Sequence, residues 1–343
     1  MGATSSDPRS EIRDHGGSLG RAEARFPHAP RPWLDLSTGI NARSYPLPPI
    51  PHNAFERLPE DADLAALAET AARAYGAASG ADIACAPGTQ ILLPLVAGLA
   101  PPGRAGILSP TYAEHRRAAA LAGHQVDEAS SLDDLCRYDL AVVVNPNNPD
   151  GRVHRRADLL ALADHLKSRA GMLVVDEAFM DVGPQDERLD GDVSGSNIVV
   201  LRSFGKFFGL AGVRIGFAIC DSALAATLRD RLGPWAVSGP ALTIGRAALG
   251  HLDWQAAMRA DLLARAARLD VVLVTAGFTI AGGTSLYRYV RHDAAREAVE
   301  ALGQNGLLVR SFDFDPAALR FGIPATDADF ERLATALDGW RSR

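Results

Sequence analysis

Five short, uninterrupted apolar runs recur along the middle of this chain, and they constrain its fold more than any other feature. The runs are 105–108, 141–144, 172–175, 198–201 and 215–219, and the helical patterns beside or between them include 61–75 and 158–170. A strand that is apolar at every position, rather than at alternate ones, is buried on both faces. We therefore predict an α/β fold in which a mostly parallel sheet is flanked by helices.

The two ends of the chain predict a second, smaller α/β domain. We assign 51–235 to the large domain, 236–343 to the small domain, and 1–50 to an amino-terminal arm and part of the small domain. The expected elements of the last segment are a long helical pattern to about residue 273, strands at 285–290, 307–309 and 318–321, and helices at 294–302 and 327–340.

The composition is that of an ordinary globular protein and argues against several classes of function. Hydrophobic residues make up 47% of the 343 positions, and the formal net charge of −6 argues against a nucleic-acid surface. No apolar run approaches the length of a membrane span, and the first residues lack the hydrophobic core of a signal peptide. Cys85, Cys136 and Cys220 lack the spacing of a zinc site or a disulfide framework. We expect a cytoplasmic protein that binds no metal, membrane or nucleic acid.

Lys206 follows the apolar run at 198–201, in a glycine-rich turn. Its neighbours in sequence are mostly apolar, and they include Phe204, Phe207 and Phe208. Desolvation in such surroundings lowers the pKa of a lysine and frees its amine to attack a carbonyl carbon. The turn therefore indicates Schiff-base chemistry, although a solvated lysine at the end of a strand would have the same local sequence.

Polar motifs also follow two other runs, and one precedes a helical pattern. Asn148 and Asp176 each lie at or just beyond the end of an apolar run. An acid that emerges from a buried strand needs a cation or a hydrogen-bond donor, which a helix start could also provide. Gly88, Thr89 and Gln90 precede a helical segment and present free backbone amides to an anion. Each motif alone is typical of an ordinary turn, but together they predict a ligand site at the carboxyl ends of the strands.

Asn148, Asp176, Lys206 and Arg214, in this order and each beside a buried run, resemble the pyridoxal-phosphate enzymes of the aspartate aminotransferase fold. The resemblance extends over nearly the whole chain, as far as Arg320. It implies a seven-stranded type of sheet in the large domain, pyridoxal 5'-phosphate as the cofactor, and a homodimer in which both subunits shape each site.

The same resemblance implies a role for each motif residue. Lys206 would bond covalently to the cofactor aldehyde, and Asp176 would pair with the protonated pyridine nitrogen. Asn148 would bind the ring hydroxyl, which makes these three the expected catalytic residues, and Tyr112 would stack on the ring. The remaining contacts, most of them to the cofactor phosphate, would come from Gly88, Thr89, Gln90, Ser203 and Arg214.

Two positions depart from the pattern of these enzymes. Phe179, expected against the cofactor, stands where relatives commonly have a tyrosine whose hydroxyl binds the ring oxygen. Its absence leaves Asn148 alone at that oxygen and should change the pKa of the cofactor linkage. Leu58 and Pro59 stand where many relatives have a Tyr-Pro pair that reaches the cofactor phosphate of the partner subunit, so that contact should differ here.

Within the superfamily, the chain most resembles the histidinol-phosphate aminotransferases and the threonine-phosphate decarboxylases of cobalamin synthesis. The motifs that carry this resemblance are 15–17, 34–41, 110–115 and 176–179. They imply decarboxylation of L-threonine O-3-phosphate to (R)-1-amino-2-propanol O-2-phosphate. The alternatives are an aminotransferase for histidinol phosphate or a related phosphorylated substrate, and a non-catalytic protein that binds the cofactor.

The resemblance also implies the contacts to the substrate. Gly39, Asn41 and Asn148 are expected at the substrate, and Arg320 at its α-carboxylate. The substrate phosphate needs further cations. The candidates are the arm arginines together with the Asn41 segment, and in competition a cluster after Tyr112: Arg13, Arg21 and Arg25; His115, Arg116 and Arg117.

Overall fold

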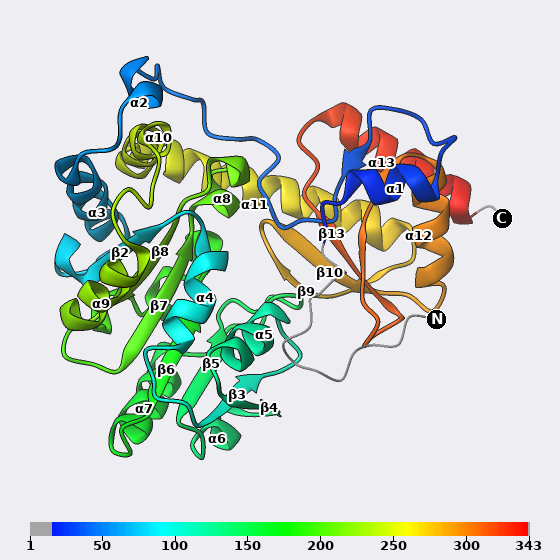
Figure 1. The fold of residues 1–343 in the computed structure, drawn as a ribbon. Coiled ribbons are helices and arrows are strands. Elements are labelled where there is room, and N and C mark those ends of the chain that lie inside the picture. Colours follow the sequence, from blue (N-terminus) through cyan, green and yellow to red (C-terminus); the bar gives the residue numbers. More distant parts are fainter. Residues whose placement is uncertain (1–15, 342–343) are drawn as a thin grey trace. The chain divides into compact units, whose positions relative to one another are not determined.

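Figure 1 shows the computed structural model of the chain, which describes residues 16–341. Its largest element is a seven-stranded sheet in the order β2, β8, β7, β6, β5, β3, β4. In that order the strands are Ile83–Ala86, Gly216–Cys220, Ile198–Ser203, Met172–Asp176, Leu140–Val144, Arg104–Leu108 and Gln125–Ala129. Neighbours from β7 to β4 are parallel, and β8 runs antiparallel to β7 and β2. The predicted fold class is confirmed.

The five apolar runs form β3, β5, β6, β7 and β8, and these strands are buried along almost their whole length. The sequence did not predict β4 or β2. β4 lies at the edge of the sheet and is polar and partly exposed, because only one of its sides meets another strand. β2 has only four residues, two of them alanines, which is too short and too small for a strand signal.

The same part of the chain holds nine α-helices among the described residues. They are α2 (Asn53–Glu56), α3 (Asp61–Tyr75), α4 (Thr89–Ala97), α5 (Glu114–Leu121), α6 (Leu132–Leu135), α7 (Arg156–Lys167), α8 (Phe204–Phe207), α9 (Ser222–Leu232) and α10 (Gly239–Gly250). α4, α5 and α9 share one core with alternate residues of the strands, so they cover the same face of the sheet. α3 has the predicted bounds, and Gly76 closes it at φ 84°, a conformation that glycine adopts without strain.

The small α/β part of the chain is built from both termini, as predicted. It holds a four-stranded antiparallel sheet, β12-β13-β10-β9, and a parallel pair, β1-β11. These strands are Arg310–Ser311, Ala318–Gly322, Tyr287–Arg291, Thr279–Thr284, Leu34–Asp35 and Leu307–Leu308. Its helices are α1 (Leu19–Arg25), α11 (Leu252–Thr275), α12 (Ala295–Gln304) and α13 (Asp327–Arg341), and the last three bury apolar faces in one core.

Three sequence expectations for these segments differ from the structure. The arm contains a helix, α1, which was not expected. The long helical pattern up to about residue 273 is two helices, α10 and α11, with a break at His251. β9 was missed because its sequence, Thr-Ile-Ala-Gly-Gly-Thr, contains two glycines, which weaken a strand signal.

The chain divides into two compact units. We call residues 45–148 and 153–252 the large unit, and the described residues 16–44, 149–152 and 253–341 the small unit. The sequence placed the change at residue 235, whereas the structure has it after Leu252, because α10 packs on α3 of the large unit. None of the described helices is both long and apolar enough to cross a membrane.

Candidate active site

Three neighbouring parallel strands of the large unit end at one edge of the sheet, because parallel strands point the same way. Asp176 is the last residue of β6, Asn148 lies just beyond β5, and Lys206 lies in α8, directly after β7. The structure thus brings these three predicted residues to the same edge. In sheets of this kind, that edge is where ligands bind.

Asp176 is held by a partner that the sequence reasoning did not assign to it. Nε2 of His115 lies 2.8 Å from Oδ2 of Asp176, and both side chains are buried. The backbone N–H of Ala178 donates to Oδ1 at 3.0 Å. The His115 side chain is only 4% exposed, and its Nε2 atom contacts the Asp176 carboxylate. We therefore no longer count His115 among the candidates for the substrate phosphate. Its place three residues after Tyr112, in the Pro-Thr-Tyr-Ala-Glu-His motif, was the available signal.

Lys206 lies among aromatic side chains, as its sequence neighbours indicated. Its sequence neighbours Phe204, Phe207 and Phe208 are fully buried, and the Nζ atom is 5.7 Å from the centre of the Phe179 ring. Phe179 is itself buried. The Phe179 ring therefore packs beside the lysine and offers it an apolar, π-electron surface.

Two glycines leave room for a cation and for backbone amides in a cradle where α4 begins. Gly88 caps this nine-residue helix at φ 93°, and a Cβ there would lie 2.4 Å from Nη2 of Arg214. Gly216 pairs with Ser203 across β8 and β7, and a Cβ on it would lie 2.3 Å from the backbone N of Thr89. Only glycines let the guanidinium and the helix amides approach this closely. A fixed cation beside the N-terminus of a helix fits the phosphate of pyridoxal phosphate.

Tyr112 and Gln90, both expected at the cofactor, are joined by a hydrogen bond. The Tyr112 hydroxyl lies 3.1 Å from Oε1 of Gln90, and Nε2 of Gln90 donates to the buried carboxylate of Glu114 at 2.8 Å. Arg117, another sequence candidate for the substrate phosphate, lies 3.5 Å from the same carboxylate. The Gln90 side chain thus links the aromatic ring to α5.

The asparagines before Asn148 hold its loop in place. Asn145 accepts the backbone N–H of His154 at 2.8 Å, and Asn147 donates to the backbone oxygen of Pro110 at 3.1 Å while its Oδ1 accepts the Thr111 hydroxyl. Asn148 itself is half-buried. The loop after β5 is therefore tied to the loop after β3.

In the small unit, Arg320 is buried in β13. Nη2 donates to the backbone oxygen of Ser37 at 2.9 Å, and the guanidinium lies 5.0 Å from the centre of the Tyr287 ring. Burial lowers the pKa of Arg320 to about 10; the charge of Arg310 contributes to this lowering, and Tyr287 opposes it. Arg310 stands directly opposite Arg320 in the β12-β13 pair, and the sequence reasoning did not single it out. Two arginines in cross-strand register face one side of a sheet, which favours a ligand with more than one anionic group.

The other expected substrate residues of the small unit are placed as follows. Gly39 and Asn41 are buried, and Oδ1 of Asn41 accepts the backbone N–H of Arg43 and lies 3.3 Å from Nη2 of Arg265. In α1, Arg25 is ion-paired with Glu300. Arg13 lies outside the described residues. Within the described part of the chain, no three His, Cys, Asp or Glu side chains are grouped to hold a metal ion.

A buried ionic cluster lies behind this edge of the sheet. Arg202, at the end of β7, is ion-paired with Asp190 and lies 3.1 Å from Glu177, which follows Asp176. All three side chains are essentially inaccessible to solvent. One cation thus faces two carboxylates, and burial raises the pKa of Glu177 well above its usual value, while Asp190 adds to the effect and Arg202 opposes it.

The cluster leads to a prediction for the pH dependence of stability. Because the pKa of Glu177 is higher in the folded chain, its protonated form stabilises the fold below the usual glutamate pKa, and this contribution is lost as the pH rises through the folded pKa. Glu177→Gln stays neutral throughout. We therefore expect its Tm to match the wild type near about pH 5 and to exceed it increasingly towards about pH 8, measured by calorimetry.

The matched control is Glu128→Gln on the exposed edge strand β4, where no such divergence is expected. A Glu177→Gln variant that is less stable than the wild type at about pH 8 would mean that the ionised pair with Arg202 outweighs the cost of burial.

Comparisons with known proteins show the family to which the chain belongs. The family model for aminotransferases of class I and II matches residues 58–337. A threonine-phosphate decarboxylase of a Sinorhizobium species is 45% identical over 94% of this chain and 97% of its own length, and one of Pseudomonas aeruginosa is 41% identical over 96% and 98%.

Solved structures share the fold. The histidinol-phosphate aminotransferase of Sinorhizobium meliloti, solved in complex with pyridoxal-5'-phosphate, superimposes with a TM-score of 0.83 at 20% identity and covers 100% of this chain and 98% of its own. The L-threonine-O-3-phosphate decarboxylase of Porphyromonas gingivalis gives a TM-score of 0.74 at 19% identity, over 90% of this chain and 100% of its own. The family model spans most of the chain and near-full-length relatives exceed 40% identity, so the chain belongs to the class I and II aminotransferase family.

Proposed function

We propose that this chain is a pyridoxal-phosphate-dependent decarboxylase that converts L-threonine O-3-phosphate to (R)-1-amino-2-propanol O-2-phosphate in cobalamin biosynthesis. The observation that carries the proposal is the likeness to two threonine-phosphate decarboxylases over nearly the whole chain. The placement of Lys206 and Asp176 at neighbouring strand ends supports it, because these are the groups that such chemistry requires.

We assign the following roles to the residues of the large unit. Pyridoxal phosphate, when bound, withdraws electrons from the bond that is broken at the substrate α-carbon. Lys206 would hold the cofactor covalently and, once the substrate amine has displaced it, would return a proton to that carbon. Asp176 would keep the pyridine nitrogen protonated, and His115 holds the carboxylate in place. Asn148 would bind the ring hydroxyl.

The cofactor ring and phosphate are held by the rest of the site. Tyr112 would cover one face of the ring, and Phe179 packs beside the lysine. The start of α4 would hold the phosphate, and Arg214 would supply a neutralising positive charge. The other members of this cradle are Gly88, Thr89, Gln90 and Ser203.

The two anionic groups of the substrate need two cations, and the small unit offers them. Arg320 is proposed to bind the carboxylate and Arg310, opposite it, the phosphate. Arg310 lines a cavity of about 300 Å³, together with Gly16, Gly17, Arg21 and Ser37, among others. Ser37 is also the residue whose backbone oxygen accepts from Arg320. This extends the earlier expectation that the arm supplies the phosphate contact.

Replacing Arg310 tests this assignment. For Arg310→Ala we expect KM for L-threonine O-3-phosphate to rise about 100-fold with little change in cofactor absorbance, because a charge-assisted phosphate contact is lost. The control is Arg291→Ala on β10 of the same sheet, where the arginine is half-exposed and paired with Asp315. Equal KM values for the two variants would exclude Arg310 as the phosphate ligand.

The reaction itself is tested by incubating the pyridoxal-phosphate form with L-threonine O-3-phosphate and no oxo-acid. The expected result is release of carbon dioxide and a product that has lost the mass of the carboxyl group. The second candidate is amino transfer from histidinol phosphate to 2-oxoglutarate. It is favoured by a histidinol-phosphate aminotransferase of Vibrio vulnificus at 32% identity, although over only 54% of this chain. Amino transfer without loss of carbon dioxide would select that candidate.

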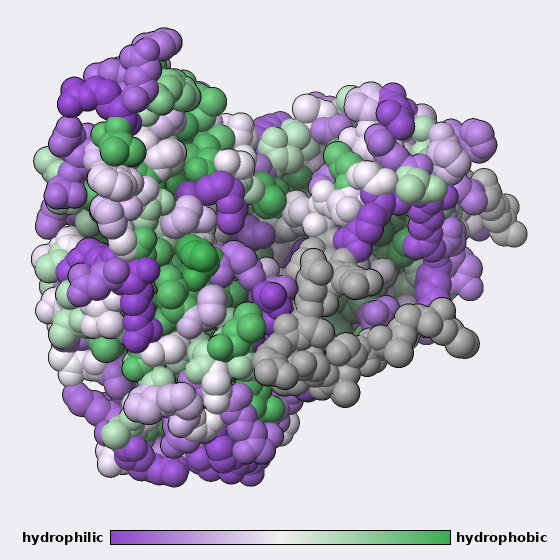
Figure 2. All heavy atoms as spheres, in the orientation of Figure 1, coloured by the Kyte–Doolittle hydropathy of each residue, from purple (hydrophilic) through white to green (hydrophobic). Residues whose placement is uncertain are grey.

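We also propose a homodimer located in the cytoplasm. Figure 2 shows apolar side chains in patches among polar ones on the large unit. In one of its segments Leu47, Phe55 and Leu58 are 59%, 65% and 63% exposed, which favours coverage by a second copy. The three cysteines are free, as expected in a reducing compartment. Light scattering of the purified protein at twice the mass of one chain would support the dimer, and the mass of one chain would overturn it.

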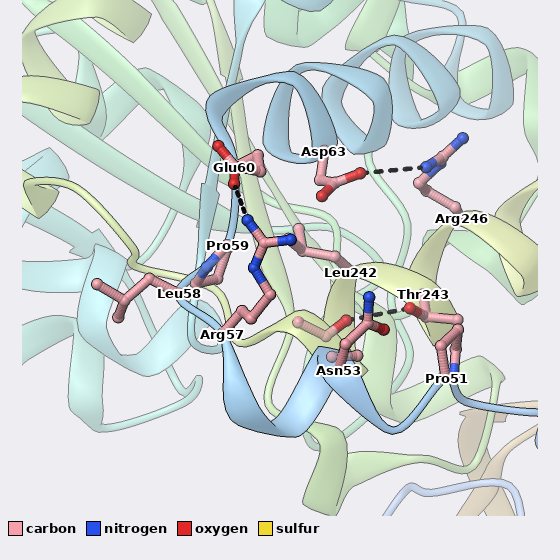
Figure 3. Close-up of a pocket in the computed structure, with 12 residues that line it drawn as sticks. Pro51, Asn53, Arg57, Leu58, Pro59, Glu60, Asp63, Leu242, Thr243 and Arg246 are labelled. Carbon is pink, nitrogen blue, oxygen red and sulfur yellow. Dashed lines mark hydrogen bonds and ion pairs between the residues drawn. The ribbon is translucent and has the colours of Figure 1, made fainter.

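Leu58 offers an apolar side chain where a tyrosine would offer a hydroxyl. Leu58 lies at a cavity of about 250 Å³ (Figure 3), whose two arginines already have carboxylate partners. Arg57 lies 3.2 Å from Glu60, and Arg246 lies 3.8 Å from Asp63. In the proposed dimer, Leu58 would therefore add an apolar contact and no hydroxyl for a cofactor phosphate.

A further inference from the structure

A chain of three polar side chains runs from α5 of the large unit to the ring of Tyr112. The Tyr112 hydroxyl lies 3.1 Å from Oε1 of Gln90, and Nε2 of Gln90 lies 2.8 Å from Oε2 of Glu114. Glu114 is buried, and the guanidinium of Arg117 lies 3.5 Å from the same oxygen. The proposed decarboxylase chemistry gives Glu114 no task, although a buried carboxylate needs a reason to be there.

The donors and acceptors of this chain follow one direction. The amide nitrogen of Gln90 donates to Oε2 of Glu114. The amide oxygen of Gln90 then faces Tyr112 and can only accept. The phenol therefore has to donate its hydrogen to Gln90, and that hydrogen is unavailable to any ligand. Burial, together with the negative charges of Glu114 and Asp176, raises the pKa of Tyr112, so the phenol keeps this hydrogen at working pH.

We propose that Glu114 is a positioning residue that acts through Gln90. Glu114 orients the Gln90 amide, and Gln90 in turn fixes the Tyr112 ring by keeping the Tyr112 hydroxyl as a hydrogen-bond donor to the Gln90 oxygen. Tyr112 then serves as a neutral stacking surface and takes no part in proton transfer. The inference depends on the proposed function only in placing the cofactor against Tyr112; the hydrogen-bond chain itself does not depend on it.

The next residue in α5, His115, fixes a second group of the proposed site. His115 holds Asp176 at 2.8 Å, and its ring meets the Tyr112 ring edge-on with centres 6.0 Å apart. Two consecutive residues in the first turn of α5 therefore fix two different groups. Glu114 fixes the Tyr112 ring through Gln90, and His115 fixes the Asp176 carboxylate. The start of α5 is thus a support for both.

The first test is a double-mutant cycle in which binding of pyridoxal phosphate is measured through the absorbance of the cofactor. In Glu114→Gln the amide of Gln90 can turn over, and we expect the dissociation constant of the cofactor to rise about 5- to 10-fold with a shift of its absorbance band. In a Tyr112→Phe background, which has no hydroxyl to fix, Glu114→Gln should change neither quantity further. Equal effects in both backgrounds would overturn the proposal, because Glu114 would then act independently of Tyr112.

The second test uses the cofactor-free protein, so that it does not rest on the proposed function. With tyrosines labelled at the ring carbon that bears the hydroxyl, the NMR signal absent from Tyr112→Phe belongs to Tyr112. That signal should move in Glu114→Gln and stay in place in Glu128→Gln, an exposed control on β4. A signal that moves in neither variant would overturn the hydrogen-bond chain. A moved signal in a protein that binds no pyridoxal phosphate would leave the chain standing and reject the function.

Discussion

Lys206→Ala is expected to lose the covalently bound cofactor and at least about 10⁴-fold in the rate of decarboxylation, because the same amine is proposed to hold the cofactor and to return the proton. The yellow absorbance of the wild-type protein should be absent. Treatment with borohydride in the presence of pyridoxal phosphate should add the mass of the reduced cofactor to the wild type and not to the variant.

The sequence supplies an unusually clean control for this experiment, since it contains only two lysines, Lys167 and Lys206. Lys167 ends α7, and its Nζ donates to the backbone oxygen of Gly195 at 2.7 Å on the surface. Lys167→Ala should keep both absorbance and activity. A reduced cofactor found on Lys167 in place of Lys206 would contradict the assignment directly.

Asp176→Ala should give the second-largest effect, a fall in kcat of about 10³-fold, because the charge that keeps the pyridine nitrogen protonated is removed. Cofactor binding should weaken much less, since the phosphate cradle around Arg214 is unchanged. Steady-state kinetics at saturating cofactor separate the two effects.

Asp164→Asn is the control for Asp176→Ala, because Asp164 lies on the exposed side of α7. The loss of Asp176 also leaves His115 without its buried partner, so the variant should be tested for folding by calorimetry. A folded Asp176→Ala variant that retains kcat within about ten-fold of the wild type would remove Asp176 from the mechanism.

The sequence predicted the parts of this protein that depend on local pattern. Continuous apolar runs located five buried strands, and polar residues at the ends of those runs located Asp176 and Lys206. β4 and β9 were missed because an edge position and two glycines remove the apolar signal on which such a prediction depends. The α10-α11 break was missed because the helical pattern continues through it.

What the sequence did not reveal are pairings between residues that are distant along the chain. His115 and Asp176 are 61 positions apart, and Gln90 and Glu114 are 24 apart. Arg310 became a candidate only when the register of β12 and β13 put it opposite Arg320. Such contacts follow from the order and register of strands and helices, which periodicity alone does not fix.

The antiparallel strand β8 constrains how such a site can change during evolution. Since β7 and β8 are adjacent and Ser203 pairs with Gly216, the proposed covalent anchor at Lys206 and the proposed phosphate anchor at Arg214 lie on one short connection whose two ends are fixed side by side. Lengthening or shortening that connection would displace both anchors together. A change in this connection would therefore alter the affinity for the cofactor and the orientation of the reacting bond at the same time. New substrate preferences would have to arise from segments outside β7, β8 and their connection.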